Sequence, residues 1–535
     1  MRILAKSLLK PGRKEYGAAA LLLSFALLFA GGCATNPVTG RSELQVISAS
    51  QEVMLGAQNF QPMQQAEGGA LINFPEVSDY VSRVGQSLAQ VSDRPELPYE
   101  FVVVNNPVPN AWALPGGKIG INRGLLTELR SEAELAAVLS HEIVHAAARH
   151  GAKAVERGML LQAGLVGIGL ASQNHDYRDL IVGGAGISAQ LLNLRHSRDA
   201  EREADFFGMK YMAAAGYDVR AAIELQRTFV RMAEEKGHGN EGWLAGMFSS
   251  HPPSRERVLA NERSASAYPA GGRVGREEHD QALAALREAA PAYEALASGY
   301  EALAQNQPRR ALQFAQQASR LRGDEAHFFG LEGKARYALG DVGGAIRTFD
   351  RAIALNPAYF DFYLQRGLLL KELGRVEAAE QDLARSASLL PTAEAHQALG
   401  MLAVQAGNYE QATSNLRIAA SALSPAGRSA RDTLTRIELP VQPGRYIQVS
   451  VRRDAQGYLL LRVENTAPLA VKNVRINVNM INPEGRVISR SPVLIPDVIP
   501  SGAGRNAPTR IGPFGTDTQV AASIRVSLDA AAIAE

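Results

Sequence analysis

The run His141-Glu142-Ile143-Val144-His145 constrains the fold more than any other part of the 535-residue chain. Its two imidazoles are four residues apart, and a helix brings them side by side on one face. So placed, two neutral ring nitrogens can hold one zinc ion, and Glu142 can reach a metal-bound water as general base. The run therefore predicts a helix that carries two of three protein ligands and the base of a hydrolytic zinc site.

The flanking residues favour that helix. No Pro or Gly occurs between Ser131 and His150, and strong helix formers dominate the segment. Ser131 can cap the helix, with Glu134 three residues later as the second half of a capping box. Apolar residues recur at helical spacing, at Leu135, Val138, Leu139 and Val144. Since HExxH also occurs by chance in unrelated helices, a third ligand has to be found elsewhere in the chain.

The candidate for that third ligand lies in the acidic segment 197–205. The metzincin arrangement would need a histidine where this chain has Gly151. Glu201 and Asp205 are instead four residues apart on one helical face. Glu201 can bind the metal while Asp205 accepts a hydrogen bond from the far nitrogen of a ligand histidine. The alternative is a solvated charged face, and Glu203 points elsewhere on the helix, to solvent or behind a ligand.

Further motifs make the chain resemble one zinc peptidase family. The run 110–117, Asn-Ala-Trp-Ala-Leu-Pro-Gly-Gly, is similar to the NAxALPGG strand ahead of HExxH in the family of the CAAX prenyl protease and the HtpX membrane protease. Glu201 to Asp205 matches the ExxxD motif of that family, and His251, Pro252 and Arg257 match its HPxxxxR motif. The segment 36–41, Asn-Pro-Val-Thr-Gly-Arg, is typical of its lipoprotein members, and the BepA-like periplasmic proteins are the most similar group.

The resemblance implies the site. The zinc ligands would be His141, His145 and Glu201, with one Zn²⁺ per chain, and Glu142 would be the catalytic base. The family is often described with Asp205 as proton donor, whereas the residues themselves favour an orienting carboxylate, and both roles stay open.

His251 has two interpretations. A histidine before two prolines is usually a loop residue, but it could also act as a fourth zinc ligand or stabilise the oxyanion. It follows the Gly-rich segment 237–250, and we hypothesise a gating loop. The other histidines show no partner pattern and are interpreted as structural or exposed, namely His150, His175, His196, His238, His279, His327 and His396.

The N-terminal segment predicts the compartment. A basic region is followed by an apolar region of thirteen residues, 18–30, shorter than the about 20 residues that span a bilayer. Gly31-Gly32-Cys33 then resembles a bacterial lipoprotein signal, and Cys33 is the only cysteine of the chain. Ala34 beside it favours the outer membrane, so we expect a periplasmic protein anchored through a lipidated Cys33. An uncleaved anchor at the inner membrane is the alternative.

Charge excludes one class of partner. The full chain has 56 basic and 54 acidic residues, and without residues 1–32 it has 51 and 53. Because nucleic-acid binding normally needs a concentrated basic patch, no nucleic-acid partner is expected.

Length and pattern predict a multidomain chain. The expected parts are a lipoprotein signal at 1–32, a tether at 33–43, a zinc metallopeptidase domain at 44–265, tetratricopeptide repeats at 290–422 and a small β-sandwich-like domain at 440–535. By resemblance the peptidase domain is mainly α and zincin-like (gluzincin), with a small β-sheet from the strands 101–104 and 119–122. Two apolar stretches, 159–171 and 180–194, favour a helical hairpin over the active site, with contact to a bilayer surface as the alternative.

The repeats rest on matched intervals. Gly340, Ala345, Phe349 and Pro357 recur 34 residues later as Gly374, Ala379, Leu383 and Pro391, the period of tetratricopeptide helix pairs. Weaker copies place Asn306 before them and Gly407 after them, so about four repeats form an α-solenoid. A plain helical spacer is the weaker interpretation. Beyond the repeats, residues 446–526 show short alternating strands with Gly, Pro and Asn between them, which favours a β-sandwich.

Two functions are consistent with these patterns. The first is a zinc endopeptidase of the periplasm that degrades misfolded or stalled envelope proteins recruited by the repeats, with the strand 113–122 pairing with an extended substrate. By resemblance, unfolded or misassembled outer-membrane proteins are the clients, and the outer-membrane assembly machinery is a candidate partner. The second is a chaperone or scaffold for outer-membrane protein assembly whose protease site is mostly latent.

Overall fold

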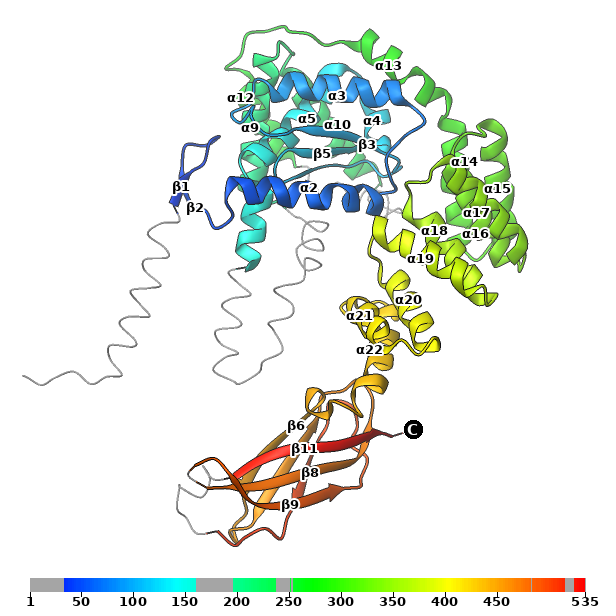
Figure 1. The fold of residues 1–535 in the computed structure, drawn as a ribbon. Coiled ribbons are helices and arrows are strands. Elements are labelled where there is room, and N and C mark those ends of the chain that lie inside the picture. Colours follow the sequence, from blue (N-terminus) through cyan, green and yellow to red (C-terminus); the bar gives the residue numbers. More distant parts are fainter. Residues whose placement is uncertain are drawn as a thin grey trace, which may run out of the picture. The chain divides into compact units, whose positions relative to one another are not determined.

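The computed structural model describes residues 33–159, 196–236, 251, 254–482, 484–514 and 524–534 (Figure 1). The expected signal, the apolar stretches after Met159 and the Gly-rich segment 237–250 lie outside these residues. The chain forms two compact units. One comprises the residues up to Gly344 with Ala354–Tyr359, and the other comprises Ala345–Ile353 with Phe360–Glu535. The fold is mainly helical with small sheets, and it includes helical repeats and a strand-rich C-terminal region, as the sequence predicts.

A three-stranded sheet of order β3-β5-β4 lies at the centre of the first unit. β3 (Glu100–Val104) is parallel to β5 (Lys118–Asn122), and β4 (Ala111–Leu114) is antiparallel to β5. The single strand expected at 113–122 is therefore wrong, because Gly116 and Gly117 both have positive φ and turn the chain into a hairpin. β3 and β4 are thus the two edge strands of this sheet, on opposite sides of β5. Helices α2 (Ala49–Ala66) and α3 (Pro75–Ala89) flank the sheet (Figure 1).

Helix α5 (Glu132–Ala147) carries the HExxH run through the core. Ser131 caps it by accepting a hydrogen bond from the Glu134 backbone N–H at 3.2 Å. The Glu134 carboxylate accepts from the Arg130 N–H, one residue before the N-cap, so the capping box is shifted by one residue. Nearly every side chain of α5 is buried, on all sides of the helix. A helix that is apolar all round belongs in a core, which is why a metal site on it is shielded from bulk water.

The segment expected as a tether folds against the C-terminal end of α5. β1 (Cys33–Thr35) pairs antiparallel with β2 (Ser42–Leu44). Between them the Asn36 side chain accepts from two backbone N–H groups and donates to the Ala148 carbonyl at 3.0 Å. Since the last carbonyls of a helix lack intrahelical partners, this bond caps the helix that carries the HExxH run. The Asn-Pro-Val-Thr-Gly run thus stabilises the C-terminal end of α5.

Among the described residues, the first unit also contains α4 (Arg123–Glu128), a helical stretch at 150–159, α9 (Arg198–Ala214), α10 (Arg220–Lys236) and α12 (Arg255–Ala265). α13 (Arg276–Glu288) follows and contacts α3 through a hydrogen bond between Tyr80 and His279 at 3.0 Å. His279 also donates to the Leu129 carbonyl, so its role is structural, as expected from the sequence.

Paired helices follow from residue 290. They are α14 (Ala290–Ala304), α15 (Pro308–Leu321), α16 (Ala326–Ala338), α17 (Val342–Leu355), α18 (Phe360–Glu372), α19 (Val376–Leu389), α20 (Ala393–Gln405), α21 (Tyr409–Ala420) and α22 (Pro425–Glu438). Gly340, Gly374 and Gly407 each end a helix with positive φ. Asn306 takes the same left-handed conformation at the equivalent place of the weaker first repeat, which confirms its register.

A buried polar cluster joins the first repeat helices to the sheet within the first unit. The Glu325 carboxylate accepts hydrogen bonds from Tyr293 (2.7 Å), Asn105 (3.1 Å) and His327 Nδ1 (2.9 Å). His327 Nε2–H donates to the Gly68 carbonyl at 2.9 Å. Burial alone would raise the pKa of Glu325, but His327 and the other donors outweigh it and lower the pKa to about 2. The carboxylate is therefore charged in the folded state and held by its donors.

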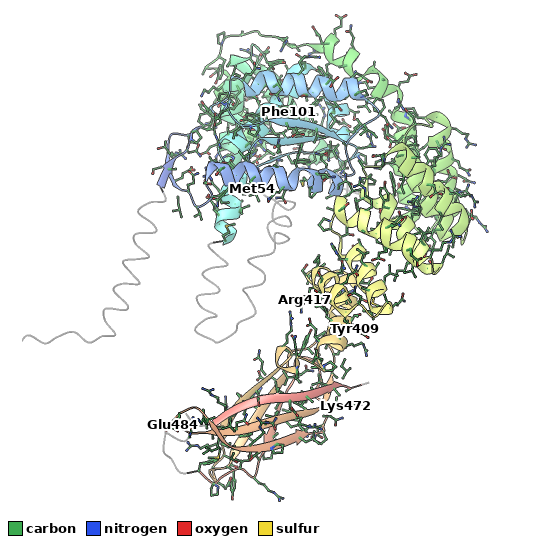
Figure 2. All side chains as sticks on the ribbon, viewed as in Figure 1. Met54, Phe101, Tyr409, Arg417, Lys472 and Glu484 are labelled. Atoms are coloured by element: carbon green, nitrogen blue, oxygen red, sulfur yellow. The ribbon has the colours of Figure 1, made fainter. Side chains whose placement is uncertain are left out.

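The C-terminal region of the second unit has two three-stranded antiparallel sheets. One has the order β10-β7-β6 and the other β11-β8-β9. The strands are β6 (Ile447–Arg453), β7 (Leu459–Asn465), β8 (Val471–Ile481), β9 (Val487–Ile495), β10 (Gly504–Pro508) and β11 (Ile524–Ile533), after a short 3₁₀ turn η1 (Pro443–Arg445). Buried residues of both sheets, such as Leu461 and Ile476, form one core. Figure 2 shows Lys472 and Glu484 toward opposite ends of this sandwich. β10 was not expected.

Within the part of the chain that the structure describes, no helix is both long and apolar enough to cross a bilayer.

We expect Glu325→Gln to lower the free energy of unfolding of the first unit by about 1–3 kcal/mol at pH 7. The folded pKa of about 2 lies below the usual 4.5, so the charged carboxylate stabilises the fold above pH 4.5 and this contribution is lost as pH falls toward 2. Urea unfolding at pH 7 and pH 3 should show the difference from wild type shrinking. Glu288→Gln, at an exposed carboxylate of α13, is the control. A difference that does not change with pH would contradict the charge argument.

Candidate metal centre

Three segments of the first unit bring the predicted site residues together. α5 supplies His141, Glu142 and His145, α9 supplies Glu201 and Asp205, and His251 lies four residues before α12. α9 reaches α5 closely because Gly208 has no side chain. A Cβ there would lie 3.2 Å from Ser140 Oγ and 3.4 Å from the backbone nitrogen of His141. This close contact sets Glu201 opposite the two histidines.

The donor atoms converge on one point. His141 Nε2 and His145 Nε2 are 3.0 Å apart, and each is 3.4 Å from an oxygen of Glu201. His251 Nδ1 is 3.0 Å from Glu201 Oε1 and 3.4 Å from His141 Nε2. Donors about 2.0–2.2 Å from a tetrahedral ion are about 3.3–3.6 Å from one another, which is close to these separations. The four residues therefore fit a metal ion at their centre.

Asp205 lies behind His141, as the sequence predicts. His141 Nδ1–H donates to Asp205 Oδ1 at 3.0 Å, which leaves Nε2 directed at the centre. Arg257 of α12 donates from Nε and Nη2 to the two oxygens of Asp205, at 2.8 and 2.7 Å. Burial raises the pKa of Asp205, but the Arg257 guanidinium outweighs it and keeps that pKa below its usual range. Asp205 is therefore a fixed anion that orients the ring of His141.

The charges of the ligands depend on one another. Burial lowers the pKa of His141, but its hydrogen bonds to Asp205 and Glu201 outweigh it and raise the pKa to about 10. Burial, and then His196, keep the pKa of His145 well below its usual value, so this imidazole is neutral. Burial also opposes ionisation of Glu201, but His251, His141 and His145 hold its pKa well below the usual range.

Glu142 has a different environment from the other carboxylates. It is 2% exposed, its Oε2 has no hydrogen-bond partner among the described residues, and its Oε1 is 3.6 Å from His251 Nε2. Burial raises the pKa of this carboxyl, against smaller opposing effects of His251 and His141. A buried acceptor without a donor is costly, and a water or a proton beside a metal would satisfy it.

Comparison with known proteins identifies two families in this chain. Residues 75–264 match peptidase family M48, and residues 333–374 match a tetratricopeptide repeat. Residues 75–264 are an M48 peptidase domain. The mitochondrial metalloendopeptidase OMA1 of Schizosaccharomyces pombe is 31% identical over 227 residues, which are 42% of this chain and 63% of that protein. The putative beta-barrel assembly-enhancing protease of Vibrio cholerae is 28% identical over 213 residues, or 37% of this chain and 41% of that protein.

The matched segments thus cover less than two thirds of either relative. Among solved structures, MamA 41-end from Desulfovibrio magneticus RS-1 is 21% identical and covers 28% of this chain and 84% of that protein, with a TM-score of 0.25.

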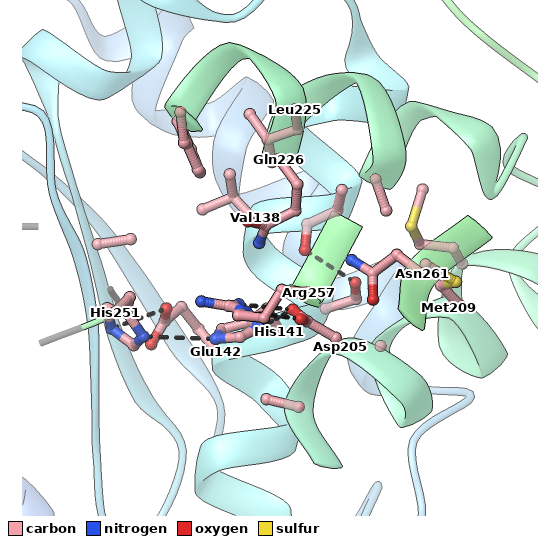
Figure 3. A pocket seen from close by; sticks show the side chains of 18 of the residues that line it. Val138, His141, Glu142, Asp205, Met209, Leu225, Gln226, His251, Arg257 and Asn261 are labelled. Carbon is pink, nitrogen blue, oxygen red and sulfur yellow. Dashed lines mark hydrogen bonds and ion pairs between the residues drawn. The ribbon is translucent and has the colours of Figure 1, made fainter. Parts of the chain in front are cut away.

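A pocket of the M48 domain opens beside the candidate metal centre. Figure 3 shows His251, Glu142, His141 and Asp205 along one side of it, with Val138, Gln226 and Leu225 across from them. The rest of the lining is mostly apolar and comes mainly from α5, α9 and α10, with single residues of β4 and α4 and two polar residues of α12, Arg257 and Asn261. A lining of this kind suits an apolar group.

Two histidines of the M48 domain were missed by the sequence analysis as parts of the site. His150 Nδ1 lies 2.8 Å from His145 Nδ1, and the His196 ring stacks on His145 with centroids 3.8 Å apart. His150 is buried, so its structural interpretation holds, but it also contacts a candidate ligand. The signal that could have found it was its position five residues after His145, just beyond the helix end.

Replacing Glu201 by Gln should remove most of the bound metal, because an amide carries no charge to balance the ion. Metal analysis of the purified full chain measures this directly. Asp199→Asn, on the same helix with a side chain that is 82% exposed, should keep the wild-type metal content. An undiminished metal content in Glu201→Gln would mean that Glu201 is not the third ligand.

Proposed function

We propose that this chain is a zinc-dependent endopeptidase of the bacterial periplasm that degrades misfolded or stalled outer-membrane proteins. One observation carries the proposal: two imidazoles and a carboxylate converge beside the buried Glu142, whose Oε2 accepts no hydrogen bond from any described residue. Two nitrogens and one oxygen are the donor set of many catalytic zinc sites, with the fourth position used by water or substrate. The M48 assignment and the metalloendopeptidase relatives support the same activity.

Each residue then has a role in peptide hydrolysis. When bound, a zinc ion would polarise the scissile carbonyl and lower the pKa of the attacking water. Glu142 takes the proton of that water and returns it to the leaving nitrogen, and its raised pKa suits both transfers. Asp205, held by Arg257, keeps His141 in the tautomer that leaves Nε2 free for the metal. β4, at the sheet edge, is the strand available to an extended substrate.

His251 fits a gate at this site. Its Nδ1 occupies the fourth corner around the donor cluster, the position that a catalytic site leaves to water. We propose that His251 as fourth ligand keeps the enzyme inactive and leaves when a substrate is bound. The occupied corner also favours the second candidate function, a chaperone or scaffold whose protease site is mostly latent.

The location and clients come from other parts of the chain. The signal-like N-terminus and the single Cys33 support lipid attachment at the outer membrane. The repeats are surfaces of the kind that bind extended protein segments, so we propose that they recruit clients or the assembly machinery. Relatives that bear the name beta-barrel assembly-enhancing protease support outer-membrane proteins as the clients.

The Glu142→Gln protein should lose peptide hydrolysis by about 10²–10⁴-fold, because the general base is removed, while its zinc content stays at the wild-type level. Cleavage of an unfolded protein and metal analysis test the two parts. Glu128→Gln, at an exposed position of α4, is the control. In a deletion strain, full restoration of outer-membrane integrity by Glu142→Gln would favour the chaperone instead, whereas trapped uncleaved clients would favour the protease.

His251→Ala should raise proteolysis several-fold and retain the zinc, because three ligands remain and the fourth corner is free for water. His396→Ala, in the repeats, should behave as wild type in the same assay. Unchanged cleavage by His251→Ala would rule out the gate, and loss of the zinc would make His251 an obligatory ligand.

A further inference from the structure

A second hydrogen-bonded chain leads away from the metal centre, on the side of His145. His145 Nδ1 is 2.8 Å from His150 Nδ1, and His150 Nε2 is 3.2 Å from Glu203 Oε2. His145 and His150 are 1% and 6% exposed, so water does not compete for these bonds. The Glu203 carboxylate, by contrast, reaches the surface, where Arg41 pairs with it at 3.2 Å. The chain thus connects a buried candidate ligand to an anchored surface carboxylate.

One arrangement of protons satisfies every atom of this chain. If His145 is to present a lone pair on Nε2 to a metal, its ring proton must be on Nδ1. That proton can then be donated to His150 Nδ1, which must be the unprotonated nitrogen of its ring. The proton of His150 is consequently on Nε2, where it donates to Glu203. The negative charge of Glu203 therefore selects the tautomer of His150, and His150 in turn selects the tautomer of His145.

The backbone after α5 is shaped to place His150. Arg149 has a φ of 63°, in the left-handed region where Gly is usual at a helix end. Buried ion pairs hold Arg149 there, with Glu52 at 3.1 Å and Glu156 at 3.3 Å. α5 ends in a two-residue turn at 148–149, and the next helical segment begins at His150. A left-handed arginine held by two buried carboxylates is what lets a residue beyond the helix end return to the face of His145.

The same helix supplies both orienting carboxylates. α9 carries Asp205, which orients His141, and Glu203, which reaches His145 through His150. Asp205 contacts its histidine directly. Glu203 points away from the metal centre, so it reaches His145 only through the imidazole of His150.

We propose that His150 and Glu203 are positioning residues that hold His145 in its metal-binding tautomer and orientation. The inference rests on the proposed function, since it takes His145 as a ligand. A partner of this kind behind a ligand histidine is commonly worth about 10- to 100-fold in metal affinity.

A second metal at His145, His150 and His196 is the competing explanation of this histidine cluster. The ring geometry opposes it. His196 and His145 stack with an interplanar angle of 25° and centroids 3.8 Å apart. Imidazole lone pairs lie in the ring planes, so two stacked rings cannot direct them at one ion. The stacked ring packs against His145 and leaves His150 as its hydrogen-bond partner.

The test measures zinc affinity of the full chain by competition with a chelator. His150→Phe keeps a planar ring but removes the acceptor, and we expect zinc binding about 10- to 100-fold weaker than wild type. His150→Gln restores an acceptor for His145 Nδ1–H, and the affinity should recover in part. Glu203→Gln keeps the size of a side chain that is 22% exposed, so it should fold normally and weaken binding in the same direction. The absorption spectrum of the Co²⁺-loaded protein should change in His150→Phe, because the ring of His145 is reoriented.

His279→Phe is the matched control, because His279 is also buried and hydrogen-bonded but lies far from the candidate ligands in the sequence and bonds Tyr80 and Leu129. It should lower the melting temperature of the metal-free protein and leave zinc affinity unchanged. Wild-type affinity in both His150→Phe and Glu203→Gln would overturn the proposal. A second equivalent of bound zinc that disappears in His150→Phe would overturn it in favour of a second metal. A wild-type protein that binds no metal would instead refute the proposed function.

Discussion

The contact of helices α5 and α9 at Gly208 is the constraint on which the site depends. A Cβ at this position would lie 3.2 Å from Ser140 Oγ, a tighter contact than most Cβ atoms make, so glycine favours the close approach of the two helices. The contact places Glu201 against two imidazoles in the interior of the M48 domain. An ionised carboxylate is costly to bury without partners, so the histidines and Arg257 around Glu201 are required by its burial as well as by the chemistry.

The three buried carboxylates near the metal centre differ in the direction of their pKa shifts because their partners differ. Despite burial, Arg257 keeps the pKa of Asp205 below its usual range, and His251 with the two ligand histidines does the same for Glu201. Glu142 has no such cation within hydrogen-bond reach among the described residues, and burial raises its pKa. Groups whose environments drive their pKa values apart divide the roles of a catalytic site between them. Two carboxylates here are fixed anions, and the third can carry a proton.

Much of the fold and site could be predicted because it depends on spacing within single helices. The pairs His141–His145 and Glu201–Asp205 follow from the helical repeat, and the tetratricopeptide helices follow from the 34-residue interval of Gly340 and Gly374. What failed depends on backbone turns or distant partners. The hairpin at Gly116 was taken as one strand, β10 is a short polar strand, and the return of His150 depends on a left-handed Arg149 that two distant carboxylates hold.

The proposed gate, His251, lies close in sequence to Arg257, a partner of the candidate ligand Glu201. His251 and Arg257 are six residues apart, and both contact Glu201, at 3.0 and 2.9 Å. Displacement of His251 alone, with Arg257 still on Asp205, would free the fourth corner and remove one competing partner from Glu201 at the same time. A carboxylate that loses competing partners binds a metal more strongly. The movement that opens the site to water would thus strengthen the third ligand, so the zinc need not be lost when the gate opens.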